Sequence, residues 1–242
     1  MRDNLPPISE IWVYLSGSPL LALVLTLSAY LLGLVLYERS ERNPLANPVL
    51  IAVILVTLSI NVLDMPYAKY FEGAQFVHFL LGTATVSLAI PIYKGFASLK
   101  GRMGILMLAL LAGGVTSIFT AIGMARWLGV NESLVQGLVA KSVTAPIAMG
   151  IAERVQASPT LTAIFAVSTG ILGAVLGRYV LDAMRVTAWW QRGFALGVGA
   201  HGIGTSRAFS VNPEAGAYAS LGMGLHGILG AVLIPYAVAW WF

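Results

Sequence analysis

Two short stretches of this sequence place residues capable of acid–base or anion chemistry inside apolar surroundings. The first, Lys141-Ser-Val-Thr-Ala-Pro146, combines a cation, two hydroxyls and a proline. The second, Gly199-Ala-His-Gly-Ile-Gly-Thr-Ser-Arg207, combines three glycines, a histidine, two hydroxyls and a cation. Because backbone N–H groups, hydroxyls and cations are the groups that hold anions in proteins, both stretches are candidate anion sites.

The two cations each have a functional and a structural interpretation. A lysine near the middle of a membrane segment costs about 3 kcal/mol or more unless it faces protein or water. We therefore expect Lys141 to be the counter-charge of an anionic substrate, helped by the N–H groups of a half-helix that starts near Thr144. The alternative is a lysine that snorkels from a half-helix end. Arg207 is suited to bidentate carboxylate binding, and its alternative is a loop arginine at the membrane interface.

The titratable residues other than these cations are candidates for proton handling. His201 and His226 lie in apolar, glycine-rich surroundings, and an imidazole that titrates near pH ~6.5 is a natural proton relay. Structural histidines bonded to neighbouring helices are the alternative. Glu214 is interpreted as a first-turn helix acid with a minor coupling role left open, and His78 as an interfacial residue.

Several other chemistries have no support in the sequence. The chain has no cysteine, so disulfides and thiolate chemistry are excluded. No nucleophile elbow, Walker loop or metal-ligand spacing occurs, so we expect no enzyme activity, no cofactor and no metal site. Gly197–Gly202 and Gly222–Gly227 match G-x-G-x-x-G but lack its βαβ context, so the prediction is close helix packing or backbone opening. The net charge of +4 is scattered between apolar spans, which disfavours nucleic acid.

The composition identifies the elements that position these residues. Of the 242 residues, 58% are hydrophobic and 10% are charged, which predicts an all-α, polytopic transmembrane helical bundle. We expect residues 1–18 to form an N-terminal segment without a signal peptide and residues 19–242 to form one transmembrane domain. The pattern predicts six full spans, at Pro19–Tyr37, Pro48–Leu63, Phe76–Tyr93, Met103–Ala125, Pro159–Leu181 and Pro213–Trp240.

The remaining two segments, Asn131–Gln156 and Trp189–Val211, are predicted to be broken, re-entrant helical hairpins. In the first, Asn131 can cap a half-helix that ends near Lys141, and Thr144 can cap a second one with Pro146 in its first turn. In the second, glycines interrupt the apolar pattern. The last span begins at Asn212-Pro213-Glu214, a capping residue followed by an N1 proline and an acid.

The distribution of positive charge predicts an orientation. Loops with Arg39 and Arg42, and with Lys94, Lys100 and Arg102, belong inside, whereas the loop Asp64–Gln75 has Lys69 against two acids. If the first broken segment enters from outside and turns back, three further arginines also lie inside: Arg178, Arg185 and Arg192. The second segment then enters from the inside. Hairpins that enter from opposite faces are typical of an inverted-repeat transporter.

Several strings resemble the LrgB/CidB family of membrane proteins over about Leu45 to Pro235. They are Asn47-Pro48, Lys141-Ser-Val-Thr-Ala-Pro-Ile-Ala148, Gly170-Ile-Leu-Gly-Ala174, Gly199-Ala-His-Gly-Ile-Gly-Thr-Ser-Arg207 and Glu214-Ala-Gly216. The resemblance implies two competing functions. Relatives include the plant plastid glycolate/glycerate transporter and bacterial systems that move pyruvate, commonly alongside a small membrane partner of the LrgA/CidA type. The family was named, however, for a holin/antiholin-like role in controlling murein hydrolases and cell lysis.

We therefore expect a multi-pass secondary carrier of small monocarboxylates in the cell (inner) membrane, coupled to protons or to exchange. The expected partners are the carboxylate, the lipid bilayer, further copies of the chain and the small membrane partner. The carboxylate would contact Lys141, Arg207 and the hydroxyls and backbone around them: Ser142, Thr144, Pro146, Gly199, Gly202, Gly204 and Thr205. His201 is the first candidate for a proton step. The alternative is a holin/antiholin-like pore or regulator of cell lysis.

Overall fold

The computed structural model describes residues 19–87, 90, 93 and 101–242. Within these ranges the regular elements are helices, and the all-α prediction is confirmed. The chain divides into two compact units, Met1–Ser87 (unit 1) and Leu88–Phe242 (unit 2). The predicted N-terminal segment 1–18 and the loop residues Lys94 and Lys100 lie outside the described residues. The prediction of one domain from residue 19 onward stays a prediction.

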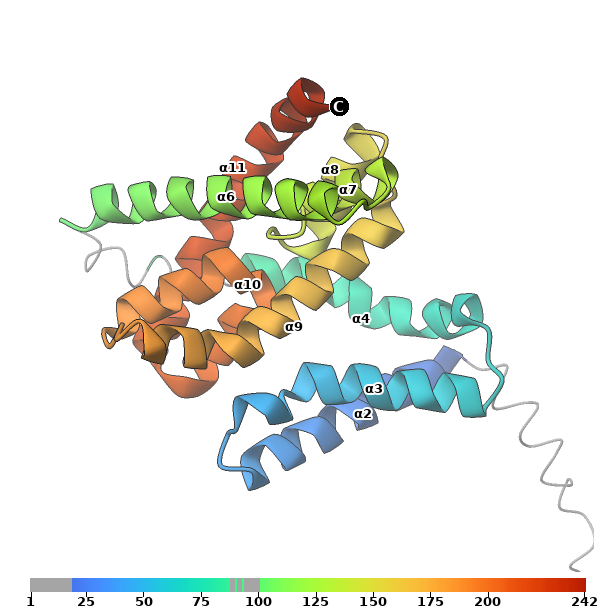
Figure 1. The fold of residues 1–242 in the computed structure, drawn as a ribbon. Helices are drawn as coiled ribbons and strands as arrows, with labels where there is room; N and C mark the ends of the chain where they lie inside the picture. The colour runs from blue at the N-terminus through green and yellow to red at the C-terminus, as the bar shows by residue number, and fades with distance from the viewer. Residues whose placement is uncertain (1–18, 88–89, 91–92, 94–100) are drawn as a thin grey trace, which may run out of the picture. The chain divides into compact units, whose positions relative to one another are not determined.

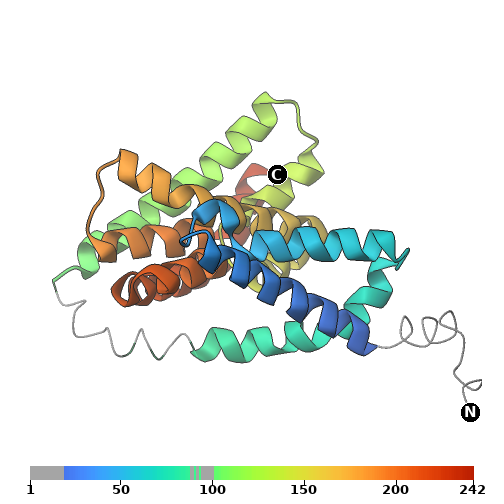
Figure 2. The same cartoon turned by 90° about the horizontal axis from the view of Figure 1, so that it is seen from below.

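Unit 1 consists of α2 (Pro19–Arg39), the short 3₁₀ helix η1 (Pro44–Ala46), α3 (Pro48–Val62) and α4 (Tyr67–Ser87). Both α3 and α4 pack against α2 (Figures 1 and 2). A Cβ on Gly33 of α2 would lie 2.7 Å from the carbonyl oxygen of Pro48, so the absence of a side chain brings these two helices together. The hydroxyls of Thr26 and Tyr70, 2.7 Å apart, join α2 to α4.

Unit 2 contains three long helices, α6 (Met103–Trp127), α9 (Pro159–Ala183) and α11 (Pro213–Trp241). Between them lie α7 (Glu132–Val139), α8 (Ala145–Arg154) and α10 (Trp189–Val211). The long helices begin where the sequence predicts. Asn212 caps α11, since its Oδ1 accepts hydrogen bonds from the N–H groups of Glu214 and Ala215 at 2.9 and 3.1 Å. Pro213 follows at the first helical position, where its missing N–H costs little.

Four of the six predicted spans are helices long and apolar enough to cross a membrane: α2, α6, α9 and α11. The predicted span Pro48–Leu63 is the apolar helix α3, which at 15 residues is shorter than the roughly 20 that a bilayer requires. The span Phe76–Tyr93 differs more. Its helix α4 begins earlier, at Tyr67, and residues 88–89 and 91–92 lie outside the described ones.

The prediction of a loop over Asp64–Gln75 was wrong for most of that range. The chain is helical from Tyr67 onward, through Lys69 and Glu72. The reason is physical, because lysine and glutamate are good helix formers, and a charge keeps a residue out of the hydrocarbon core without excluding it from a helix. The side chain of His78, interpreted as interfacial, is not among those described.

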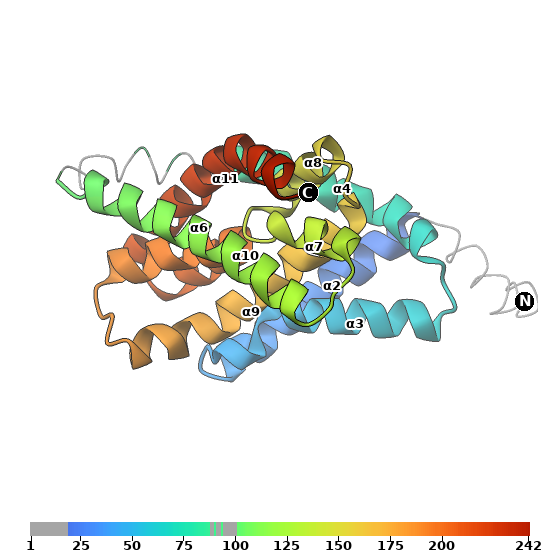
Figure 3. The ribbon, with the colours of Figure 1, turned by 45° about the horizontal axis from the view of Figure 1, so that its top comes forward.

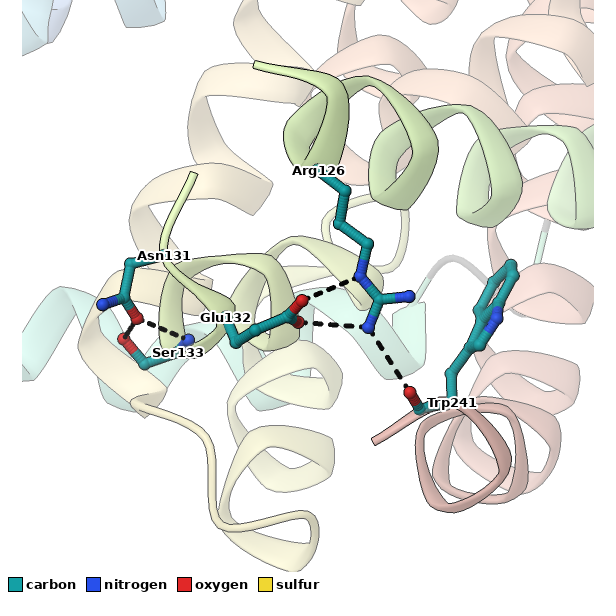
Figure 4. A network of polar contacts seen from close by, with 5 residues as sticks. All are labelled: Arg126, Asn131, Glu132, Ser133 and Trp241. Atoms are coloured by element: carbon teal, nitrogen blue, oxygen red, sulfur yellow. Dashed lines mark hydrogen bonds and ion pairs between the residues drawn. The ribbon is translucent and has the colours of Figure 1, made fainter. Parts of the chain in front are cut away.

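The first broken segment is a hairpin of two short helices, α7 and α8, joined by the turn Ala140–Thr144. Asn131 caps α7 through a hydrogen bond from the Ser133 N–H to its Oδ1, at 2.9 Å (Figure 4). Thr144 occupies the capping position of α8, but its side chain makes no capping hydrogen bond. Pro146 lies in the first turn of α8, as predicted.

Both ends of this hairpin lie at one end of unit 2. Glu132, at the start of α7, binds Arg126 at the end of α6 through two hydrogen bonds of 2.9 and 3.1 Å. The same guanidinium donates to the carbonyl oxygen of Trp241 at the end of α11, at 3.4 Å (Figure 4). The end of α8 leads directly into Pro159, the start of α9. We call this the α7–α8 end.

The second broken segment, α10, is also folded back on itself. His201 has φ 39° and ψ −129°, which divides α10 into a first half, Trp189–Ala200, and a second half, Gly202–Val211. Leu196 and Gly204 would be about 12 Å apart along a straight helix. Instead, a Cβ on Gly204 would lie 2.5 Å from the carbonyl oxygen of Leu196. The two halves therefore form a hairpin with its turn at His201.

Both ends of α10 lie at the opposite end of unit 2, which we call the α10 end. Asp182, in the last turn of α9, accepts a 2.6 Å hydrogen bond from Arg192 near the start of α10. The second half of α10 ends next to Pro213, where α11 begins. Figure 3 shows α7 and α8 on one side of unit 2 and α10 on the other. The two hairpins thus enter unit 2 from opposite ends, the arrangement that the sequence predicts; the inverted repeat itself stays a prediction.

Arginines gather at the α10 end. Arg102, which precedes α6, donates to the hydroxyl of Tyr218 on α11 at 3.1 Å and lies over the ring of Trp190 on α10. Arg178 lies beside Asp182, its Nε 3.6 Å from the carboxylate. Arg102 therefore lies at the same end of unit 2 as the arginines of α9 and α10, as the charge distribution predicts. That this end faces the inside of the cell stays a prediction.

Glycines bring the first half of α10 against α11. A Cβ on Gly197 would overlap the backbone carbonyl of Ala219, and one on Gly222 would lie 2.8 Å from the carbonyl oxygen of Phe194. A Cβ on Gly227 would lie 2.8 Å from the side-chain Cδ1 of Ile147 on α8. Gly197, Gly222 and Gly227 are therefore helix-packing residues, as predicted, whereas Gly199 in the first string meets no heavy atom within 4 Å.

Candidate functional site

The turns of the two hairpins meet inside unit 2. We call Ala140–Thr144 the first tip and His201 with its flanking residues Ala200 and Gly202 the second tip. Lys141 of the first tip lines the same groove as Gly199 and Ala200, which lead into the second tip. Val143 of the first tip packs against Gly230 of α11, where a Cβ would lie 2.6 Å from its Cγ1. Segments far apart in the sequence are thus assembled around one lysine.

Lys141 is partly buried in the turn between α7 and α8. Its Nζ donates a 2.9 Å hydrogen bond to the hydroxyl of Ser117, which lies in the middle of α6. The described carboxylates of unit 2 lie at its two ends, on Glu132 and Glu153 or on Asp182 and Glu214. The ammonium is therefore held by a neutral hydroxyl, and no carboxylate lines the groove beside it. The positive end of the α8 dipole lies at the same tip.

Ser142 connects the first tip to α11. Its hydroxyl lies 3.1 Å from Nε2 of His226, and both residues are buried. The imidazole packs against Gly114 of α6, where a Cβ would lie 3.0 Å from Cε1. A hydroxyl both donates and accepts, so this pair can form with either neutral tautomer of the histidine. His226 therefore ties the first hairpin to two long helices.

His201 connects the second tip to α9. Its Nε2 donates to the carbonyl oxygen of Ala166 at 2.8 Å, because a carbonyl can only accept. Gly170 makes room for the ring, since a Cβ there would lie 2.5 Å from Cε1 of His201. The positive φ of this buried histidine is a strained conformation that persists only where surrounding contacts fix it. The structure thus places His201 at the turn itself.

The remaining predicted residues of α10 differ in their surroundings. Thr205 is buried, and its hydroxyl contacts the sulfur of Met223 at 3.8 Å. Gly204 is buried against the first half of α10, whereas Gly202 is partly exposed. Arg207 is partly buried on the second half of α10 and lies about 9 Å from His201 along the helix axis. Arg207 and Thr205 are not among the residues that line the groove of Lys141.

Three predicted residues lie at the edge of this constellation or outside it. Thr144 is the last residue of the first tip, at the capping position of α8, and Pro146 lies in the first turn of that helix. Glu214 is exposed in the first turn of α11, about 18 Å along that helix from His226. The structure therefore brings together Lys141, Ser142, His226 and the second tip, and it does not bring Glu214 to them.

Sequence reasoning missed the partners contributed by the long helices. Ser117 on α6 binds Lys141, and Thr169 on α9 lines the groove beside it. Ala166 on α9 contributes its backbone carbonyl, which accepts the hydrogen bond from His201. Hydroxyls inside an otherwise apolar predicted span were a usable signal for Ser117 and Thr169. No side-chain pattern marks a carbonyl acceptor such as that of Ala166.

Comparisons with known proteins agree with the resemblance seen in the sequence. The model of the LrgB-like family matches residues 26–240. The uncharacterized protein YwbG of Bacillus subtilis is 33% identical over 91% of this chain and 97% of its own length. The holin-like protein CidB of Staphylococcus epidermidis is 29% identical, and that of Staphylococcus aureus 28%, each over 86% of this chain and 93% of its own length. No solved structure matches.

Proposed function

We propose that this chain, which belongs to the LrgB-like family, is a secondary carrier of small monocarboxylates of the glycolate, glycerate or pyruvate kind. Transport would be coupled to protons or to exchange and would require no catalytic step. The proposed location is the cell (inner) membrane, which the chain would cross several times. Four helices long and apolar enough to cross a membrane support the membrane location.

One observation carries this proposal: Lys141 lies where two hairpins from opposite ends of unit 2 meet, and no carboxylate among the described residues lines the adjacent groove. A cation without a carboxylate beside it favours an anionic ligand over a cationic or neutral one. Broken helices that meet from opposite sides are typical of carriers that expose one site alternately to each side. A simple water-filled pore has little need of this construction.

The proposed roles follow the contacts. Lys141 would neutralise the carboxylate, exchanging its bond to Ser117 for one to the ligand. Ser142, Thr144 and Thr205 would supply hydroxyls, with Arg207 as a second cation once the second half of α10 shifts. His201 is the first candidate for a proton step, because its bond to Ala166 fixes the ring at the second tip.

Uptake into proteoliposomes tests the proposal. The purified chain should take up labelled glycolate or pyruvate saturably while retaining a co-trapped dye. Lys141→Gln removes the charge but keeps a similar length, and we expect it to lower uptake at least tenfold. Lys69→Gln, a charge removal on α4 in unit 1, is the matched control and should leave uptake unchanged. Equal uptake by Lys141→Gln and the unmodified chain would contradict the mechanism.

The second candidate function is a holin-like pore or a regulator of cell lysis. The name of the CidB relatives, holin-like protein, favours this candidate over the carrier. In that case the polar tips would line an assembly interface between copies of the chain or with a small membrane partner of the LrgA/CidA type. Release of the co-trapped dye in the same proteoliposomes would support the pore and count against the carrier.

A further inference from the structure

A groove of about 500 Å³ extends from Lys141 along unit 2, between α9 and the first half of α10. Its walls carry apolar side chains, which are Leu172, Leu176, Val180 and Leu181 of α9 and Ala195 and Leu196 of α10. From Thr169 to Val180 the α9 wall is about 16 Å long at 1.5 Å per residue. This length exceeds what a two- or three-carbon acid occupies.

The groove is polar at one end and apolar along the rest. Among the described residues that line it, Lys141 is the charged one and Thr169 the other polar one. Leu172, Leu176 and Val180 are 57%, 48% and 52% exposed, so their side chains are available to a ligand. A cation at the end of an apolar wall complements a molecule with one anionic head and an apolar tail.

The floor of the groove is kept open by a glycine. Gly199 is exposed, and a Cβ built on it would have no heavy atom within 4 Å. The glycines facing it on α9 are different, since Gly173 packs against Ala200 and Gly177 against Leu196. Gly199 therefore leaves space next to Lys141 that a side chain there would fill.

We infer that this groove binds monocarboxylates with an unbranched aliphatic tail, the carboxylate at Lys141 and the tail along α9. The inference rests on the proposed function for the role of Lys141 as the carboxylate-binding residue, and the binding of longer acids goes beyond that function. Dicarboxylates fit poorly, because their second charged group would be placed against leucines and lose hydrogen bonds to water. The site would thus favour longer acids such as hexanoate and octanoate over acetate.

The first test is equilibrium binding of labelled octanoate to the full chain in lipid nanodiscs, with empty nanodiscs as the blank. Unlabelled butyrate, hexanoate and octanoate are then used in turn to displace the labelled octanoate. Each buried methylene contributes about 0.8 kcal/mol, so the dissociation constant should fall about threefold to fourfold per added methylene. Octanol has the same tail without the carboxylate and should compete at least tenfold more weakly than octanoate.

Two matched variants locate the binding site. Gly199→Leu should fill the groove beside Lys141 and weaken octanoate binding at least tenfold. Gly123→Leu, on α6, is the control, because its Cβ position also has no heavy atom within 4 Å but lies outside the groove. Lys141→Gln should weaken octanoate and leave octanol unchanged.

The outcomes separate this inference from the carrier proposal, since binding in nanodiscs requires no transport. Octanoate that binds no tighter than butyrate, or equally to Gly199→Leu and Gly123→Leu, would overturn the inference while saturable pyruvate uptake still supported the carrier. Octanol that binds as tightly as octanoate would also overturn the inference and would identify the groove as a binding site for lipid acyl chains. Tight, Lys141-dependent octanoate binding without any uptake would support the site and contradict the carrier.

Discussion

The two hairpins of unit 2 bring their tips to the same place but are built from different residues. The first hairpin is broken over the turn Ala140–Thr144, and its polar side chains bind the long helices α6 and α11. The second is broken at a single residue, His201, and its halves are held by glycines that contact backbone. The first tip is therefore fixed by hydrogen bonds, and the second hairpin by close packing.

This difference has a consequence for movement. Side-chain hydrogen bonds such as those of Lys141 and Ser142 can be exchanged for bonds to a ligand at little net cost. Backbone packed against backbone at Gly193 and Gly197 leaves no such exchange, because any separation opens a void. We therefore expect the first tip to respond to ligand, while the first half of α10 moves together with α11 or not at all.

The largest expected effect comes from adding a methyl group to the packed hairpin. Gly197→Ala places a Cβ against the carbonyl of Ala219 and should destabilise the fold by about 2 kcal/mol or more. Gly199→Ala, two residues on in the same helical half, meets open space and should be neutral or stabilising by up to about 1 kcal/mol. Thermal unfolding in detergent micelles measures both. Equal melting temperatures for the two variants would show that the second hairpin is not held by packing.

An intermediate effect is expected at the first tip. Ser142→Ala leaves the buried imidazole of His226 without its hydroxyl partner and should cost about 1 kcal/mol. His226→Leu removes the imidazole and also disturbs packing against Gly114, so a double-mutant cycle is needed to isolate the pair. We expect a coupling energy of about 0.5 to 1.5 kcal/mol between the two positions. Strict additivity would mean that hydrogen bonding does not fix the first tip.

The smallest effect is expected at the ion pair between Arg126 and Glu132, which closes the α7–α8 end. Their side chains are 35% and 56% exposed, so the pair should contribute less than about 1 kcal/mol. Glu132→Gln should lower the melting temperature slightly, and high salt should remove the difference from the unmodified chain. A fall in melting temperature as large as that of Gly197→Ala would show that the start of α7, and not the first tip, anchors the first hairpin.

Much of this arrangement could be predicted from local sequence. Capping residues and prolines marked the starts of α7, α8 and α11, because they act on the backbone within a few residues. The two broken segments were visible as charge, hydroxyl, proline and glycine inside apolar stretches. The distribution of arginines predicted that the hairpins enter from opposite ends.

What local sequence could not supply were contacts between distant segments. The bond of His201 to Ala166 spans 35 residues, and the pair Ser142 and His226 spans 84. Such pairs depend on how helices pack, which composition and periodicity do not specify. The start of α4 at Tyr67 was missed for a related reason, since hydropathy locates a membrane core and not the end of a helix.

The proposed carrier requires two hairpins that enter the membrane from opposite faces, and labelling of single cysteines from each side tests this directly. The chain has no native cysteine, so each introduced one reports alone. Leu128→Cys and Glu153→Cys flank the first hairpin, and Met184→Cys and Val211→Cys flank the second, all at exposed positions. We predict that an impermeant maleimide labels the first two from one face only and the last two from the other. Labelling of Leu128→Cys and Glu153→Cys, or of Met184→Cys and Val211→Cys, from opposite faces would mean a full crossing and contradict the account.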